Sequence, residues 1–208
     1  MDSKSQKDTL RRGWTTGTCA TAATRAAIEA LWTGEFPDPV TVTLPKGQQV
    51  AFSLASSDLG DGFARAAIVK DAGDDPDVTH GALVVVTVRP GAEGSGITFH
   101  AGRGIGTVTK PGLPLPPGEP AINPVPREMM RTAIAEAVVQ VSHPQLTPDV
   151  AIEVSIPNGE SLAKKTLNGR LGIVGGLSVL GTTGIVIPFS CAAWIDSIHR
   201  GIDIARAT

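Results

Sequence analysis

The segment Lys110–Pro126 constrains the fold more than any other part of this 208-residue chain, because it contains seven prolines. A proline has no backbone N–H to donate, so we expect this segment to be neither helix nor central strand. It leads directly into a predicted helix, Pro126–Val141, which begins with a proline and places Met130, Ile134 and Ala137 on one face. We therefore expect a rigid loop wrapped onto a domain, not a linker between domains.

Helices and strands are expected on both sides of this loop. Thr18–Leu31 is alanine-rich and is followed by Gly34, which indicates a helix with Thr18 as its N-cap. Strands are predicted at Val40–Leu44, Gln48–Leu54, Phe63–Lys70, Ala82–Arg89, Ile97–His100, Gly104–Thr109 and Asp149–Ile156, a short helix at Asn158–Leu167, and a last helix at Ser190–Ala207 that Gly201 interrupts. The order lacks a regular βαβ rhythm, so the fold class expected is an α/β (α+β) sandwich with a mixed sheet.

Composition excludes several classes of protein. The net charge of -2 and the 4% aromatic content, without tyrosine, argue against a nucleic-acid-binding protein. The two cysteines, Cys19 and Cys191, are far apart and fit a reducing cytoplasm. No signal peptide or membrane span is expected, and neither the cysteines nor the four histidines have the spacing of metal ligands. The chain is therefore predicted to be cytoplasmic, without a membrane segment or a metal site of its own.

The densest polar cluster is the Asp-rich loop, Lys70–Gly81. Its four carboxylates lie within seven residues, at Asp71, Asp74, Asp75 and Asp77. A calcium-binding EF-hand is excluded because Gly73 and Ala82 occupy two ligand positions of that pattern. Two interpretations stay open: a solvated turn between strands, or carboxylates that attract a cationic ligand such as a sulfonium. His80, at the end of the loop, is a candidate general base.

A second cluster is the glycine-rich segment, Gly172–Gly184. Gly176, Gly181 and Thr183 have the spacing of a phosphate-binding Walker A loop, but Thr182 occupies the position of its lysine. Without that cation a nucleotide triphosphatase is not expected. The glycines either bring backbone amides close to an anion or a flat ring, or allow tight packing.

Basic residues beside glycine or proline form a third group. Most surface cations have no specific role, but Arg103 lies between two glycines and Arg127 follows two prolines closely. Rigid neighbours reduce the entropy lost when a guanidinium binds a carboxylate, so a polycarboxylate ligand would suit such positions. The full group is Arg11, Arg12, Lys46, Arg103, Lys110, Arg127, Lys164, Lys165 and Arg170.

Five ordered blocks of the sequence resemble the cobalt-precorrin-5B C1-methyltransferase family, the CbiD type. They are Arg12–Ala20, Val69–Gly81, Ala101–Met129, Thr166–Gly176 and Leu180–Gly184. The resemblance implies transfer of a methyl group from S-adenosylmethionine to C1 of cobalt-precorrin-5B, giving cobalt-precorrin-6A, in the anaerobic route to cobalamin (vitamin B12). It further implies that cobalt enters only as part of the tetrapyrrole substrate. The resemblance also implies the fold: the first lobe of the family looks like a rearranged ribosomal-S5-domain-2-like fold, and a Rossmann-like lobe follows it.

The resemblance and the polar clusters together assign residues to roles. Asp71, Asp74, Asp75 and His80 are expected to shape the reacting end. Contacts to the tetrapyrrole are expected from Thr15, Thr16, Thr18, Arg103, Lys110, Asn123, Arg127 and Arg170. Contacts to S-adenosylmethionine are expected from Gly172, Gly175, Gly176, Gly181, Thr182 and Thr183.

The expected organisation is a flexible N-terminus at 1–12, an α/β lobe at 13–188, and a helix at 189–208 that leads towards a second lobe absent from the chain. A homo-oligomer, or association with other cobalamin-pathway enzymes, is also expected. The alternative function is a non-catalytic corrinoid-binding module, or an inactive fragment of the enzyme. A phosphate-binding small-molecule kinase is the third hypothesis, and it depends only on the spacing from Gly176 to Thr183.

Overall fold

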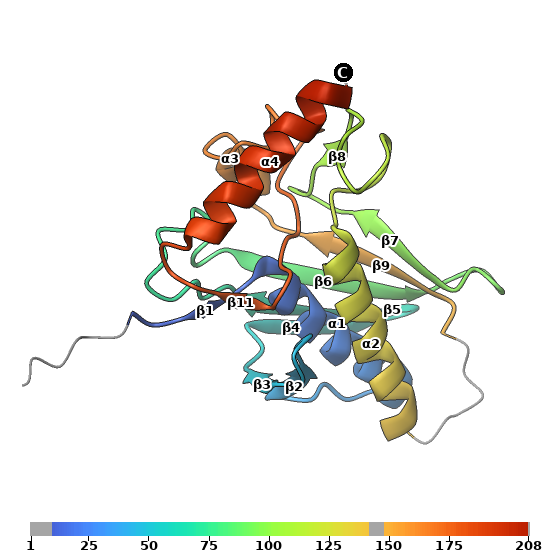
Figure 1. The fold of residues 1–208 in the computed structure, drawn as a ribbon. Helices are drawn as coiled ribbons and strands as arrows, with labels where there is room; N and C mark the ends of the chain where they lie inside the picture. The colour runs from blue at the N-terminus through green and yellow to red at the C-terminus, as the bar shows by residue number, and fades with distance from the viewer. Residues whose placement is uncertain (1–9, 142–147, 208) are drawn as a thin grey trace, which may run out of the picture.

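The computed structural model describes residues 10–141 and 148–207, and its centre is a five-stranded mixed sheet (Figure 1). The strand order is β4 (Ser56–Gly60), β5 (Phe63–Val69), β6 (Leu83–Pro90), β9 (Val150–Ser155) and β7 (Ile97–Ala101). All neighbours are antiparallel except β7 and β9, which run parallel. The expectation of a mixed-sheet α/β fold is confirmed.

Two helices cover one face of this sheet. α1 (Thr16–Thr33) packs on β5 and β6, and α2 (Pro124–Gln140) packs on α1. Every residue of α1 from Thr16 to Ala30 is buried, since its many alanines allow the helix backbone to approach the sheet closely. The core therefore lies between α1, α2 and the alternating valines and isoleucines of β5, β6 and β9.

The ends of both helices correct the sequence predictions. The N-cap of α1 is Thr15, not Thr18: the Thr15 hydroxyl accepts a hydrogen bond from the Thr18 amide. Gly34 ends the helix in the left-handed conformation, as expected. α2 begins at Pro124, inside the segment predicted to be non-helical, because amides in the first turn need no helical partner and prolines are tolerated there.

The hairpin is present as β2 (Val40–Thr43) and β3 (Gln49–Phe52). The strand β4 was not predicted, because Ser56–Gly60 is exposed and polar and carries no alternation of apolar residues. The predicted strand Gly104–Thr109 shortens to β8 (Thr107–Val108), which pairs with β10 (Ile173–Val174).

The remaining elements surround the end of the sheet. β1 (Gly13–Trp14) pairs with β11 (Ile185–Val186), and α3 (Gly159–Ala163) is shorter than the predicted Asn158–Leu167. α4 (Cys191–Ala207) continues through Gly201, so the predicted interruption is wrong. The space beside Gly201 is open, and a single exposed glycine costs a helix only about 1 kcal/mol.

Candidate functional site

The N-terminal strand is fastened to the Asp-rich loop by charge and by backbone contacts. The guanidinium of Arg11 binds both carboxylate oxygens of Asp71, and the Arg11 amide donates to Asp74 Oδ2 at 2.6 Å. The Trp14 amide donates to the carbonyl of Asp71 at 2.7 Å. Residues 10–12, part of the predicted flexible N-terminus, are thus anchored at Arg11, while residues 1–9 lie outside the described part of the chain.

Two glycines make this contact close. A Cβ on Gly13 would lie 2.0 Å from the Ala72 carbonyl carbon, so no larger residue fits there without moving the loop. Gly73 has a φ of 66°, and a Cβ on it would lie 2.2 Å from the Arg11 carbonyl oxygen.

Inside the loop, Asp77 neutralises a buried lysine. Lys70 has a side chain only 1% exposed, and its Nζ lies 2.6 Å from Asp77 Oδ2. The other oxygen of Asp77 accepts from the amide and hydroxyl of Thr79. Burial alone would raise the pKa of Asp77, but Lys70 and the Thr79 hydrogen bonds outweigh burial and lower it.

Asp71 is a permanent carboxylate at physiological pH. Hydrogen bonds from the Arg11 side chain and the Gly73 amide lower the pKa of Asp71 to about 2. It can therefore stabilise positive charge but cannot act as a proton donor near neutrality.

His80 bonds to the same loop. Its Nδ1 accepts the Ala72 amide at 3.1 Å, so the neutral ring carries its proton on Nε2. A general-base role would require the ring to release Ala72 first.

The threonines and the end of the glycine-rich segment join this assembly. The Thr18 hydroxyl donates to the Gly184 carbonyl at 2.7 Å, and the Gly17 amide donates to the Leu180 carbonyl at 2.8 Å. A Cβ on Gly181 would lie 2.2 Å from Thr15 Oγ1. The structure therefore brings the predicted residues Thr15, Thr18 and Gly181 into contact.

Asp75 links the Asp-rich loop to Phe189, which follows the glycine-rich segment. Its Oδ1 accepts the amide of Phe189 at 3.0 Å, and Phe189 has a φ of 56°, which is unusual for a residue with a side chain. We call the assembly of residues 11–18, 71–80 and 180–189 the Asp-loop site.

A hollow of about 380 Å³ opens beside Asp71. Its apolar lining includes Trp14 and Phe52, whose rings meet edge to face at 5.5 Å between centroids, and Ile68. Trp14 lies in the block Arg12–Ala20 that resembles the family, but the sequence alone predicted no role for it. The position of Trp14 beside the threonines could have indicated a binding role. Phe52 had no such indication, because its pattern predicted only a strand.

The other predicted residues form a second group around β8 and β10. A Cβ on Gly176 would lie 2.3 Å from the Gly104 carbonyl oxygen, and Gly172 packs on the aliphatic stem of Lys110. Within residues 10–141 and 148–207, the charged groups of Arg103, Lys110 and Arg170 have no ion pair or side-chain hydrogen bond, and all three residues are exposed. These three cations are available to an anionic ligand.

Arg127 differs from them because its charge is already paired. Its Nη2 lies 2.8 Å from Glu119 Oε2, its Nε donates to the Ile122 carbonyl at 2.7 Å, and the guanidinium stacks on Phe99. Arg127 thus fastens the proline-rich loop to α2. Asn123 precedes α2 and its side chain makes no capping hydrogen bond.

The remaining predicted residues, Thr16, Gly175, Thr182 and Thr183, make fewer contacts with the rest of the site. Thr16 is buried in the first turn of α1, and Gly175 and Thr182 are exposed. Thr183 bonds to the backbone of Ile185. In the described part of the chain, no group of three His, Cys, Asp or Glu residues is arranged to hold a metal ion. No described helix is long and apolar enough to cross a bilayer.

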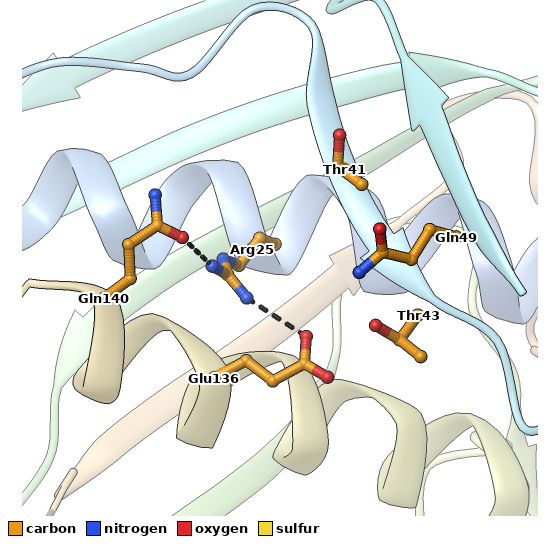
Figure 2. A pocket seen from close by; sticks show the side chains of 6 residues that line it. All are labelled: Arg25, Thr41, Thr43, Gln49, Glu136 and Gln140. Carbon is orange, nitrogen blue, oxygen red and sulfur yellow. Dashed lines mark hydrogen bonds and ion pairs between the residues drawn. The ribbon is translucent and has the colours of Figure 1, made fainter. Parts of the chain in front are cut away.

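A separate polar hollow of about 320 Å³ lies between α1, α2 and the β2–β3 hairpin (Figure 2). Arg25 points into it from α1 and is bound by Glu29, Glu136 and Gln140. None of its six lining residues was predicted to be functional, and its one cation is matched by two carboxylates. Its lining is Arg25, Thr41, Thr43, Gln49, Glu136 and Gln140.

Comparison with known proteins identifies the lineage of this arrangement. The family model named CbiD matches residues 3–188, which takes in the Asp-loop site almost entirely. The chain belongs to the CbiD family.

Several curated relatives of the chain are named cobalt-precorrin-5B C(1)-methyltransferase. The protein from Agrobacterium fabrum is 68% identical over 200 residues, which are 96% of this chain and 52% of the relative. The proteins from Brucella anthropi and Methylorubrum extorquens are 65% and 64% identical, covering 97% and 98% of this chain and 54% and 55% of the relatives. The chain therefore spans about half the length of these CbiD relatives.

A solved structure supports the fold. The crystal structure of a cobalamin biosynthesis protein (cbiD) from Archaeoglobus fulgidus matches with a TM-score of 0.66 and 35% identity. The match covers 91% of this chain and 58% of the archaeal chain.

Proposed function

We propose that the chain is part of an S-adenosylmethionine-dependent methyltransferase that adds a methyl group to C1 of cobalt-precorrin-5B, giving cobalt-precorrin-6A. The observation that carries this proposal is the Asp-loop site, in which three segments far apart in sequence meet beside an aromatic hollow. The name of relatives 63–68% identical to the chain supports the same reaction. The specific resemblance of the lobe to a rearranged ribosomal S5 domain 2 belongs to the proposal as well.

The hollow has the chemistry that a sulfonium-bearing methyl donor requires. S-adenosylmethionine, when bound, supplies an electrophilic methyl group, a positive charge and an aromatic ring. Trp14 offers a partly exposed ring, the buried ring of Phe52 supports it from the core, and Asp71 stays ionised beside them. In the contacts of the described residues, the four carboxylates of the loop meet two cations, Arg11 and Lys70, so the loop keeps a negative field.

The chain's own residues would act by positioning and by excluding water. Methyl transfer from a sulfonium needs alignment of two reactants more than a covalent nucleophile. The tight contacts at Gly13, Gly73 and Gly181 hold the threonines and the aspartates in fixed relative positions. Acidic side chains of the tetrapyrrole would bind the unpaired cations Arg103, Lys110 and Arg170.

Binding measurements on the 208-residue chain test this assignment. In equilibrium dialysis with S-adenosylmethionine, we expect Trp14→Ala and Asp71→Asn to weaken binding at least about tenfold. Asp58→Asn, on the exposed strand β4, is the matched control and should leave binding unchanged. Thermal unfolding of each variant separates loss of a contact from loss of the fold. Equal affinity in Trp14→Ala and wild type would contradict the placement of the donor in this hollow.

A corrinoid-binding module without methyl transfer is the second candidate. It is favoured by the exposed cations Arg103, Lys110 and Arg170, which are unpaired among the described residues and suit the acidic side chains of a tetrapyrrole whether or not a methyl donor binds. Cobalt-precorrin-5B binding without any S-adenosylmethionine affinity would support that candidate. The kinase hypothesis has lost its basis, since Gly176 packs on Gly104 and Gly181 packs on Thr15, and strand β11 follows where a phosphate-binding loop needs a helix.

A further inference from the structure

The helix α4 carries an apolar stripe that the described chain does not cover. Its members recur every three or four residues and fall within about 100° of the helix circumference. Trp194 is 72% exposed and Ile198 is 58% exposed. We call this set the α4 stripe; it consists of Cys191, Trp194, Ile195, Ile198 and Ile202.

The opposite side of the helix holds it in place. Ile204 is 4% exposed, and its backbone lies so close to Gly112 that a Cβ there would be 2.8 Å from Ile204 Cα. Figure 1 shows α4 along the outside of the molecule, away from the five-stranded sheet. The stripe is therefore turned outward by a helix that is itself seated on the proline-rich loop.

The connection into α4 extends the exposed apolar surface. Ile187 and Phe189 are 53% and 64% exposed, and Phe189 is fixed by the hydrogen bond from its amide to Asp75. Exposed large apolar side chains that gather on one helix face, as in the α4 stripe, are characteristic of an interaction site. Phe189 also belongs to the Asp-loop site, so the chain leads from that site directly into α4.

The length of the relatives indicates what covers the stripe. The match to the Methylorubrum extorquens protein takes in 98% of this chain, so it includes most of the 17 residues of α4. It accounts for only 55% of that relative. This relative therefore contains a further portion of nearly equal length outside the match.

We propose that the α4 stripe docks onto the remaining portion of the CbiD relatives, the part outside the region matched by this chain. The docked portion would then border the Asp-loop site through Phe189 and Asp75. A membrane surface fits less well. Arg200 pairs with Asp196, and the charges of Arg206 and Asp203 offset each other, so α4 has no net positive charge from its arginines and aspartates to attract anionic lipid.

The test is co-expression of the tagged 208-residue chain with the remaining portion of the Agrobacterium fabrum relative. We expect a one-to-one complex by native mass spectrometry. Cys191 provides a footprint, because it is exposed whereas Cys19 is buried. Labelling of Cys191 by a maleimide should slow at least about tenfold in the complex relative to the chain alone.

Matched variants locate the contact. Trp194→Glu and Ile198→Glu should each weaken the complex at least about tenfold, since central apolar anchors dominate interfaces. Val139→Glu is the control: Val139 is 79% exposed on α2, outside the stripe, and its substitution should leave the complex intact.

Three outcomes would overturn the proposal. They are unchanged labelling of Cys191 in the presence of the soluble remaining portion, a complex that forms equally well with the wild type and with Ile198→Glu, and a homodimer of the chain that Ile198→Glu dissociates. None of these readouts depends on methyl transfer, so the proposal can fail while the proposed function stands.

Discussion

The helices α1 and α4 have almost the same length but opposite relations to the rest of the molecule. α1 is buried from Thr16 to Ala30, whereas in α4 Ile204 is the one buried residue of Cys191–Ala207. The contrast lies in side-chain size. α1 uses alanine, threonine and glycine to approach the sheet, and α4 carries its large apolar side chains on the outward face. α1 is therefore an element of the fold, and α4 is an element of an interface.

The largest difference in stability is expected between the i,i+4 ion pairs of the two helices, because the pair in α1 is buried and the pair in α4 is exposed. Arg25 and Glu29 in α1 have side chains 7% and 11% exposed, while Arg200 and Asp196 in α4 are 38% and 65% exposed. Arg25→Ala should lower the free energy of unfolding by about 4 kcal/mol, since it leaves the buried Glu29 carboxylate without its cation. Arg200→Ala should change it by less than about 0.5 kcal/mol. Urea denaturation measures both, and equal losses would break the comparison.

Apolar truncation should give the next largest difference. Ile28→Ala, at a fully buried site, should lower the free energy of unfolding by about 3 kcal/mol through a cavity in the core. Ile198→Ala removes the same atoms from an exposed site and should cost less than about 0.5 kcal/mol in the chain alone. A cost above 2 kcal/mol for Ile198→Ala would show that the stripe is already packed.

The N-caps sharpen the comparison at smaller scale. Thr15 caps α1 through the Thr18 amide, and Ser190 accepts from the Ala193 amide at the start of α4. Thr15→Ala should lower the free energy of unfolding by about 1 kcal/mol, because the capped helix is part of the cooperative core. Ser190→Ala should fray α4 without shifting the global unfolding transition. Far-ultraviolet circular dichroism would measure the loss of helix, and near-ultraviolet circular dichroism would measure the global transition. A shift of the global midpoint by Ser190→Ala would contradict this.

The smallest effect is expected from Cys19 in α1, through the dependence of stability on pH. Burial raises the pKa of Cys19 to about 12 from an ordinary value near 9. The folded state therefore binds this proton more tightly, and its contribution to stability is complete below pH 9 and is lost as pH rises towards 12. Cys19→Ala should flatten that alkaline loss, at a cost of about 1 kcal/mol below pH 9 for the small cavity that it leaves. An equal alkaline loss in Cys19→Ala would assign it to other groups.

The sequence predicted elements wherever apolar residues recur with a clear period. α1, the hairpin, β5, β6, β7 and β9 appear close to their expected positions, because alternating valines and alanine-rich runs encode burial directly. β4 was missed because an exposed edge strand has no such pattern. The start of α1 was misplaced because Thr15 and Thr18 are both good caps and only geometry decides between them.

The candidate site was predictable as a set of residues but not as an arrangement. The Asp-rich loop and the threonines were identified, yet the pairing of Arg11 with Asp71, 60 positions apart, has no local signal. Likewise, Arg127 was expected to contact the tetrapyrrole, and only the fold reveals that Glu119 already pairs with it. Partners across long sequence separations depend on tertiary packing, which no local pattern contains.

Amide hydrogen exchange on the 208-residue chain tests the central contrast most directly. Helical amides in a buried element exchange only with global opening, whereas those of a helix with one buried side chain exchange through local fraying. We predict that residues 16–33 exchange at least about a hundredfold more slowly than residues 191–207, a difference of roughly 2.7 kcal/mol. Equal protection of α1 and α4 in the chain alone would contradict the assignment of α4 to an interface.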